Sequence, residues 1–125
     1  MTENEIAKII VDKCYQIHKK LGPGLLESVY EAILAYELEK MGLKVVRQLP
    51  IPVVWETVKM DIGFRVDLLV ENKVIVELKS VEKTAPVHGK RLLTYLRLSK
   101  KKLGLLTNFG ESLIKDGIKR VVNGL

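Results

Sequence analysis

Three residues whose types suit metal-dependent chemistry lie in one short segment, FRVDLLVENKVIVELKS. Asp67 is followed ten residues later by Glu77, and Lys79 comes two residues after that. Apolar residues alternate on both sides of the polar triplet 71–73, which predicts two antiparallel strands joined by a tight turn. A three-residue turn places Asp67 directly opposite Glu77, with Cα atoms about 4.5 to 5.5 Å apart. The segment therefore predicts two carboxylates side by side, with a lysine on the same face.

The hydrophobic pattern supports this register, because a two-residue turn would mix polar and apolar residues on each face. The predicted core face consists of Phe64, Val66, Leu68, Val70, Val74, Val76 and Leu78. On the opposite face, two directly opposed carboxylates repel each other unless a cation lies between them. Carboxylate oxygens, a backbone carbonyl and waters are ligands that suit hard ions. Asp67 and Glu77 are therefore predicted to bind Mg²⁺ or Mn²⁺.

A ladder of surface ion pairs is the alternative for this face. Arg65 and Lys79 could neutralise the two acids without any bound ion, and the pattern alone leaves both interpretations open. Leu69 and Ile75 share the face and imply that another element covers it. Partly buried carboxylates without strong partners are costly, which favours the metal site.

The predicted cover is a helix over residues 25–41. Its apolar stripe is formed by Tyr30, Leu34, Leu38 and Met41. Extending the stripe back by one turn reaches Glu27, which adds a third carboxylate where a core-facing residue is expected. A glutamate favoured by the dipole in the first helical turn is the alternative explanation for Glu27.

The other elements follow from caps and spacing. Thr2 and Glu5 form a capping box for a first helix, which Gly22-Pro23-Gly24 ends. The remaining expected elements are strands at 43–49, 53–60, 64–70 and 74–79, a helix opened by Pro86 that ends near 99, a strand at 103–109, and a short strand or helix turn at 118–122. With 125 residues, 47% of them hydrophobic, these elements predict one α/β (α+β) domain over residues 1–125.

Basic residues concentrate in one part of this chain, whose net charge is +6. Seven lysines and arginines and no acidic residue lie between positions 83 and 102. Lys90, Arg97 and Lys101 recur at spacings of seven and four, which predicts one stripe if the segment is helical. A solvated helix face is the alternative, but a polyanionic partner such as nucleic acid also fits.

Several classes of protein are disfavoured by composition. No apolar run approaches the ~20 residues that cross a bilayer, and the first residues do not resemble a signal segment. We therefore expect a cytoplasmic protein with no membrane partner. Cys14 is the only cysteine, so it can form no internal disulfide, and it has no partners nearby for a zinc site.

The segment LGPGLLESVY resembles a known family. Its Gly24, Glu27 and Tyr30 have the spacing that names the GxxExxY proteins, a group assigned to the PD-(D/E)XK nuclease superfamily. The similarity also includes His18, residues 64–67, 76–79, 86–88 and 92–96, and Asn108-Phe109. It covers nearly the whole chain.

The resemblance implies a restriction-endonuclease-like αβββαβ core, a mixed sheet flanked by helices, with an extra N-terminal helix. It implies that Asp67 and Glu77 bind Mg²⁺ or Mn²⁺ and that Glu27 adds a ligand directly or through water. Lys79 would orient or activate water, so Asp67, Glu77, Lys79 and Glu27 form the expected catalytic set. The implied activity is a nuclease that hydrolyses phosphodiester bonds of nucleic acid through metal-activated water.

Two departures from the family pattern bear on activity. Val66 stands where the superfamily name has a proline, and Arg91 stands where a glutamine often occurs four residues before Tyr95. Arg91 could bind a phosphate bidentately or pair with a site carboxylate. It therefore favours the alternative function, a catalytically inactive nucleic-acid-binding or protein-interaction module on a nuclease fold.

DNA is expected ahead of RNA as the partner, and both a monomer and a homodimer stay open. His18 and His88 match the family pattern but are expected to be structural. The residues expected to contact nucleic acid are Lys90, Arg91, Tyr95, Arg97 and Lys101.

Overall fold

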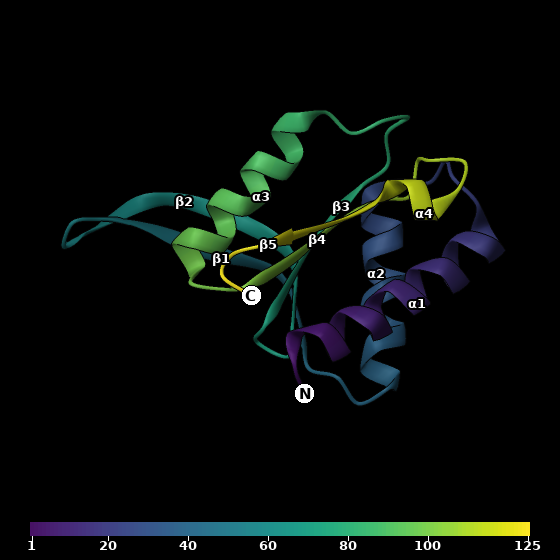
Figure 1. The fold of residues 1–125 in the computed structure, drawn as a ribbon, viewed down its shortest axis with the longest axis horizontal. Helices are drawn as coiled ribbons and strands as arrows, with labels where there is room; N and C mark the ends of the chain where they lie inside the picture. Colours follow the sequence, from purple (N-terminus) through teal and green to yellow (C-terminus); the bar gives the residue numbers. More distant parts are fainter.

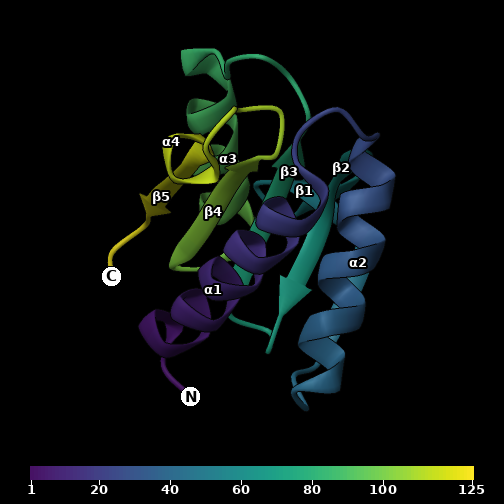
Figure 2. The same cartoon turned by 90° about the vertical axis from the view of Figure 1, so that its right-hand side faces the viewer.

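A mixed five-stranded sheet with helices on both faces forms the centre of the computed structural model, which describes residues 1–125 (Figures 1 and 2). The elements are α1 (Glu3–Leu21), α2 (Glu27–Lys40), β1 (Val45–Trp55), β2 (Val58–Val70), β3 (Val74–Lys79), α3 (Pro86–Ser99), β4 (Leu103–Asn108), α4 (Ile114–Gly117) and β5 (Ile118–Val122). This is the expected α+β domain with an extra N-terminal helix.

The strands follow one another across the sheet in the order β1-β2-β3-β4-β5. Neighbouring strands are antiparallel except β3 and β4, which are parallel and are connected through α3. The crossover helix packs on one face of the sheet, while α1 and α2 pack on the other (Figures 1 and 2).

The larger core lies between the sheet and the first two helices. From α1 it takes Ile6, Ile10, Cys14 and Ile17, and from α2 it takes Tyr30, Leu34 and Leu38. The Cys14 side chain is completely buried, and this burial raises the pKa of its thiol to about 12. The smaller core lies under α3, where Leu92 and Leu96 contact residues of β2, β3 and β4.

The predicted ends of the first helix and the predicted start of the third agree with the structure, whereas the second helix begins at Glu27, two residues after its predicted start. The Thr2 hydroxyl accepts the Glu5 backbone N–H at 3.2 Å, and the Glu5 carboxylate accepts the Thr2 N–H at 2.9 Å, so the capping box is confirmed. Gly22, with φ +69°, ends α1. The third helix begins at Pro86, as expected. None of the helices is long and apolar enough to cross a membrane.

The first hairpin is longer than the sequence suggests. We expected Pro50 and Pro52 to separate two strands, but β1 runs through both of them. Proline cannot donate to a sheet ladder, and it is tolerated here because β1 is an edge strand. The hairpin extends beyond the rest of the molecule (Figure 1). It exposes Trp55 next to its turn and Ile62 further along β2.

The predicted register of β2 and β3 is confirmed, but the predicted core face is partly wrong. Leu68 pairs with Val76, as a three-residue turn requires. Phe64 and Val66, however, lie under α3 and not with Leu68 on the opposite face. The direction of the side chains changes at Asp67, where the ladder with β1 lacks a pair. Strict alternation along the strand could not anticipate this local irregularity.

Candidate active site

Asp67 and Glu77 lie where the ladder between β2 and β3 ends. Leu68 and Val76 form the pair farthest from the turn, and the two acids lie one residue farther from the turn on each strand. Their side chains bond to the backbone of the opposite strand. The Leu78 N–H donates to Asp67 Oδ2 at 2.8 Å, and the Asp67 N–H donates to Glu77 Oε1 at 3.2 Å. The predicted proximity of the two acids is therefore seen in the structure.

The pair has an electrostatic cost that no neighbouring cation removes. Burial, and after it the negative charge of Asp67, raise the pKa of Glu77 to about 7. The Asp67 N–H and the charge of Lys79 act in the opposite direction, but they do not compensate. A carboxylate in this position gains more from a divalent cation than an exposed one would.

The ion-pair ladder that the sequence left open is not present. Arg65 donates to the Gln48 backbone carbonyl at 3.2 Å instead of pairing with Asp67. The ion pairs of the structure are Lys8–Asp12, Lys40–Glu37 and Arg47–Glu31, and none of them involves Asp67, Glu77 or Lys79. The two acids thus meet without a salt-bridge partner.

The face of β3 that carries Glu77 is covered by α3, and not by the second helix as expected. A small pocket forms between them, lined by Glu77, Lys79, His88, Arg91 and Tyr95, among others. The expectation failed because the apolar stripe of α2 packs on the opposite face of the sheet. The basic helix therefore covers Glu77.

Arg91 and Tyr95 project from α3 towards this pocket. Arg91 is exposed and forms no ion pair with a site carboxylate, so of the two roles considered for it, the phosphate contact is the one that the geometry leaves available. The Tyr95 ring stacks on Phe64 with centroids 4.0 Å apart and planes 7° apart. This stack fixes the helix against β2 next to the acids.

Both histidines have structural hydrogen bonds. His88 Nδ1 accepts the Ala85 N–H at 2.9 Å and so caps the start of α3. Neutral His88 must then carry its proton on Nε2, and burial together with the charges of Lys79 and Arg91 lowers its pKa. His18 Nε2 lies 2.9 Å from the Glu111 carbonyl oxygen.

Glu27 begins α2 and is exposed, instead of facing the core as its place in the stripe suggested. The helix starts at this residue, so Tyr30 is its first buried side chain. The Tyr30 hydroxyl donates to the Gly22 carbonyl at 2.6 Å and accepts the Leu25 N–H at 3.2 Å. The Ser80 hydroxyl donates to the Leu25 carbonyl at 2.6 Å, which ties this loop to the end of β3.

Glu27 is therefore held at the end of the sheet where β3 carries Glu77, and its charge contributes to raising the pKa of Glu77. No three His, Cys, Asp or Glu side chains come close enough together to hold an ion directly. Asp67 and Glu77 form the close pair, and Glu27 lies outside it.

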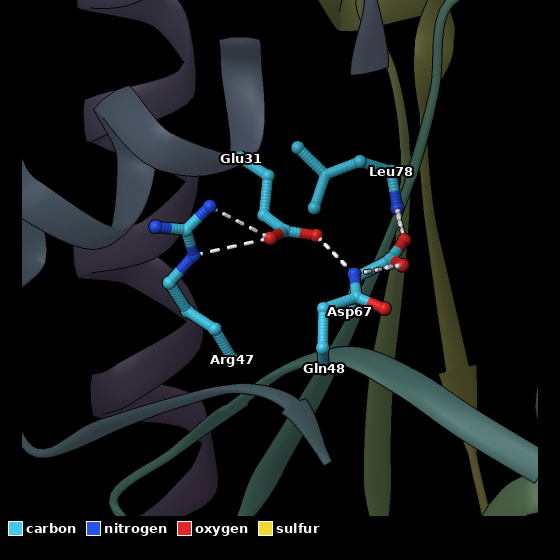
Figure 3. Close-up of polar contacts among 5 residues, drawn as sticks. All are labelled: Glu31, Arg47, Gln48, Asp67 and Leu78. Carbon is cyan, nitrogen blue, oxygen red and sulfur yellow. Dashed lines mark hydrogen bonds and ion pairs between the residues drawn. The ribbon is translucent and has the colours of Figure 1, made fainter. Parts of the chain in front are cut away.

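A buried carboxylate that sequence reasoning missed lies next to this pair. Glu31 is only 5% exposed, and its Oε2 accepts from Arg47 Nε at 3.1 Å and forms an ion pair with Arg47 Nη2 at 3.1 Å (Figure 3). Its Oε1 accepts from Gln48 Nε2, and the same nitrogen donates to Asp67 Oδ1 at 3.2 Å. The available signal was an acidic residue one turn after Glu27, at the edge of an apolar stripe.

The predicted basic stripe is correct only in part. Lys90 and Arg97 are exposed on α3. The helix ends at Ser99, and Lys100 has a left-handed backbone with φ +58°. Lys101 therefore leaves the stripe, and its ammonium donates to Asn72 Oδ1 in the turn between β2 and β3 at 3.1 Å.

The close pair fits a hard divalent ion. Both groups offer carboxylate oxygens, the ligands that Mg²⁺ and Mn²⁺ prefer. Burial and the charge of Asp67 raise the pKa of Glu77, and a bound cation would favour its ionised form against both effects. The residues present thus match the donor chemistry that such an ion needs.

Comparison with known proteins agrees with this geometry. A family model described as the PD-(D/E)XK nuclease superfamily matches residues 4–121. No curated protein and no solved structure matches the chain. The matched range includes both acids, Lys79 and all of α3, and the chain therefore belongs to the PD-(D/E)XK nuclease superfamily.

Proposed function

We propose that this protein hydrolyses phosphodiester bonds of nucleic acid with the help of Mg²⁺ or Mn²⁺. The observation that carries the proposal is the meeting of Asp67 and Glu77 beside α3 without any ion-pair partner. Two partly buried carboxylates in this state form an unfavourable arrangement unless a cation binds. Superfamily membership supports the same chemistry.

Asp67 and three residues of the neighbouring pocket have distinct tasks in this proposal. Asp67 and Glu77 would hold the ion, which supplies Lewis-acid polarisation of the phosphoryl oxygen and a lowered pKa of water. Lys79, two residues beyond Glu77, would place its ammonium near the phosphorus and stabilise the negative charge that develops there. Arg91 would hold a phosphate oxygen through its guanidinium.

We also infer that the chain belongs with the GxxExxY proteins within its superfamily. Tyr30 of that motif bonds to Gly22 and Leu25, on either side of Gly24, and so holds the loop that precedes Glu27. This loop keeps Glu27 at the end of the sheet where β3 carries Glu77. From this position Glu27 would contact the ion through water.

Purified protein should cleave at least one of plasmid DNA, single-stranded DNA and RNA when Mn²⁺ or Mg²⁺ is present. Cleavage should stop in EDTA and return when the ion is added in excess. Glu77→Gln should be inactive, whereas Glu39→Gln, an exposed change on α2, should cleave like the wild type. Binding of nucleic acid without cleavage of any substrate would contradict the proposal and favour the non-catalytic module.

Binding to nucleic acid should depend on salt through the exposed cations of α3. Each phosphate contact that is lost lowers the slope of log affinity against log salt by about 0.7 to 0.9. The double variant Lys90→Gln, Arg97→Gln should therefore flatten the slope by about 1.5 units in a fluorescence anisotropy titration without divalent ions. Lys19→Gln, Lys20→Gln removes the same charge from α1 and should leave the slope unchanged. Equal slopes for the two double variants would show that α3 is only a solvated face.

A further inference from the structure

The backbone of β1 is irregular at Gln48, opposite Asp67. Gln48 has φ +49°, a left-handed conformation that is unfavourable for a residue with a side chain. Residues on both sides of it pair with β2 in one register, but no pair joins Gln48 to Asp67. Side chains alternate between the two faces of a regular strand, so residues three positions apart should point to opposite faces. Val46 and Leu49 both contact the core under α3, which shows that the alternation of β1 is interrupted between them. A strained residue that persists in a strand needs a compensating interaction.

The side chain of Gln48 supplies that interaction. Its Nε2 donates to Glu31 Oε1 and, at 3.2 Å, to Asp67 Oδ1 (Figure 3). The amide orientation follows from chemistry, because its oxygen would repel both carboxylates if the group were reversed. The two N–H groups of one amide can thus serve two acids that would otherwise repel each other.

Glu31 provides a fixed anchor for this amide. It is buried, and Arg47 binds its other oxygen through one hydrogen bond from Nε and an ion pair with Nη2, so its charge is compensated. On the far side, Asp67 Oδ2 accepts the Leu78 N–H at 2.8 Å. Asp67 is therefore held from both sides, by Gln48 at one oxygen and by β3 at the other.

We propose that Gln48 is a positioning residue for Asp67, which it links to the buried Glu31–Arg47 pair so that the Asp67 carboxylate is preoriented for a divalent ion. The inference rests on the proposed function for the identity of the ion. The fixed orientation of Asp67, which is the structural part of the inference, does not depend on the proposed function. Partners that orient a metal ligand typically change metal affinity 10- to 100-fold when they are removed.

Two variants separate this role from a general effect on stability. Gln48→Ala and Gln48→Gly both remove the amide, but glycine adopts positive φ without strain, so Gln48→Gly should melt at the higher temperature of the two. Both should weaken Mn²⁺ binding by about 10- to 100-fold in calorimetry. Gln16→Ala, on the exposed side of α1, is the matched control and should bind like the wild type. Wild-type affinity in the glycine variant would overturn the proposal.

A measurement without metal distinguishes this proposal from the proposed function. The Leu78 amide proton, which is bound to Asp67, should move upfield in the NMR spectrum and exchange faster with solvent in both Gln48 variants. If the wild type binds no Mn²⁺ but Leu78 responds in this way, the proposed function fails and the positioning role stands. An unchanged Leu78 amide would show that Asp67 needs no help from Gln48 and would overturn the inference.

Discussion

Replacing Lys79 by methionine should lower the rate of cleavage by about 100- to 1,000-fold, which is the usual cost of removing one group that stabilises transition-state charge. Methionine keeps most of the aliphatic stem, so packing against the pocket is preserved while the ammonium is lost. Lys79 lines the pocket with Glu77 and Arg91 and forms no ion pair, which leaves its charge available for a phosphate. Single-turnover cleavage at saturating Mn²⁺ measures the effect.

Two controls apply to the Lys79 variant: its affinity for nucleic acid, and the cleavage rate of a variant at a different lysine. Nucleic-acid affinity should fall only slightly, because the lysine acts on charge that develops during the reaction. Lys83→Met, an exposed lysine in the segment before α3, should cleave at the wild-type rate. A Lys79→Met protein as fast as the wild type would place the activity in another site or in a contaminant.

Replacing Glu77 by glutamine should stabilise the metal-free protein at neutral and alkaline pH. Below about pH 4.5 the carboxyl is protonated in both the folded and the unfolded chain, and the two proteins should melt alike. Between pH 4.5 and about 7 the unfolded chain releases the proton while the folded chain keeps it, so wild-type stability falls. Above this window the cost is constant, at most on the order of 3 kcal/mol, or roughly 10 °C in melting temperature.

Thermal melts in EDTA from pH 4 to 9 measure this difference. Glu77→Gln is suitable because an amide oxygen can still accept the Asp67 N–H. Asp67→Asn is less suitable, since both oxygens of Asp67 accept N–H groups, and an amide nitrogen would oppose one of them. Glu39→Gln should follow the wild-type curve throughout.

Mn²⁺ should offset most of the stability difference between the two proteins. An ion at about 100 times its dissociation constant stabilises the wild type by ~2.7 kcal/mol, and the glutamine variant should lose most of this gain. A wild type that is indifferent to Mn²⁺, together with parallel pH curves, would mean that Glu77 is neither strained nor a ligand.

The central hairpin could be predicted from sequence because several independent signals agree there. Alternation, the polar triplet and the requirement for one apolar face select a single register, and Leu68 indeed pairs with Val76. The capping box at Thr2 and the proline at the start of α3 are local signals that need no tertiary contact. Local chemistry of this kind survives folding because it does not depend on distant residues.

The features that could not be predicted from the sequence depend on tertiary contacts. Phe64 and Val66 face α3 beside the irregularity at Gln48, whose left-handed backbone occurs together with side-chain bonds to Glu31 and Asp67. A glutamate in an apolar stripe reads as a boundary residue unless its arginine partner, sixteen positions away, is known. The choice between α2 and α3 as the cover of Glu77 likewise depends on how the helices are distributed over two faces, which periodicity cannot specify.

The burial of Cys14 beneath α1 has a chemical result for the chain as a whole. Thiols react with oxidants and with other thiols as thiolates, and complete burial in an apolar core suppresses both ionisation and access. No second cysteine is available to form a bridge within the chain. While α1 stays packed on the sheet, the folded protein therefore resists oxidation of its thiol and disulfide cross-linking between copies.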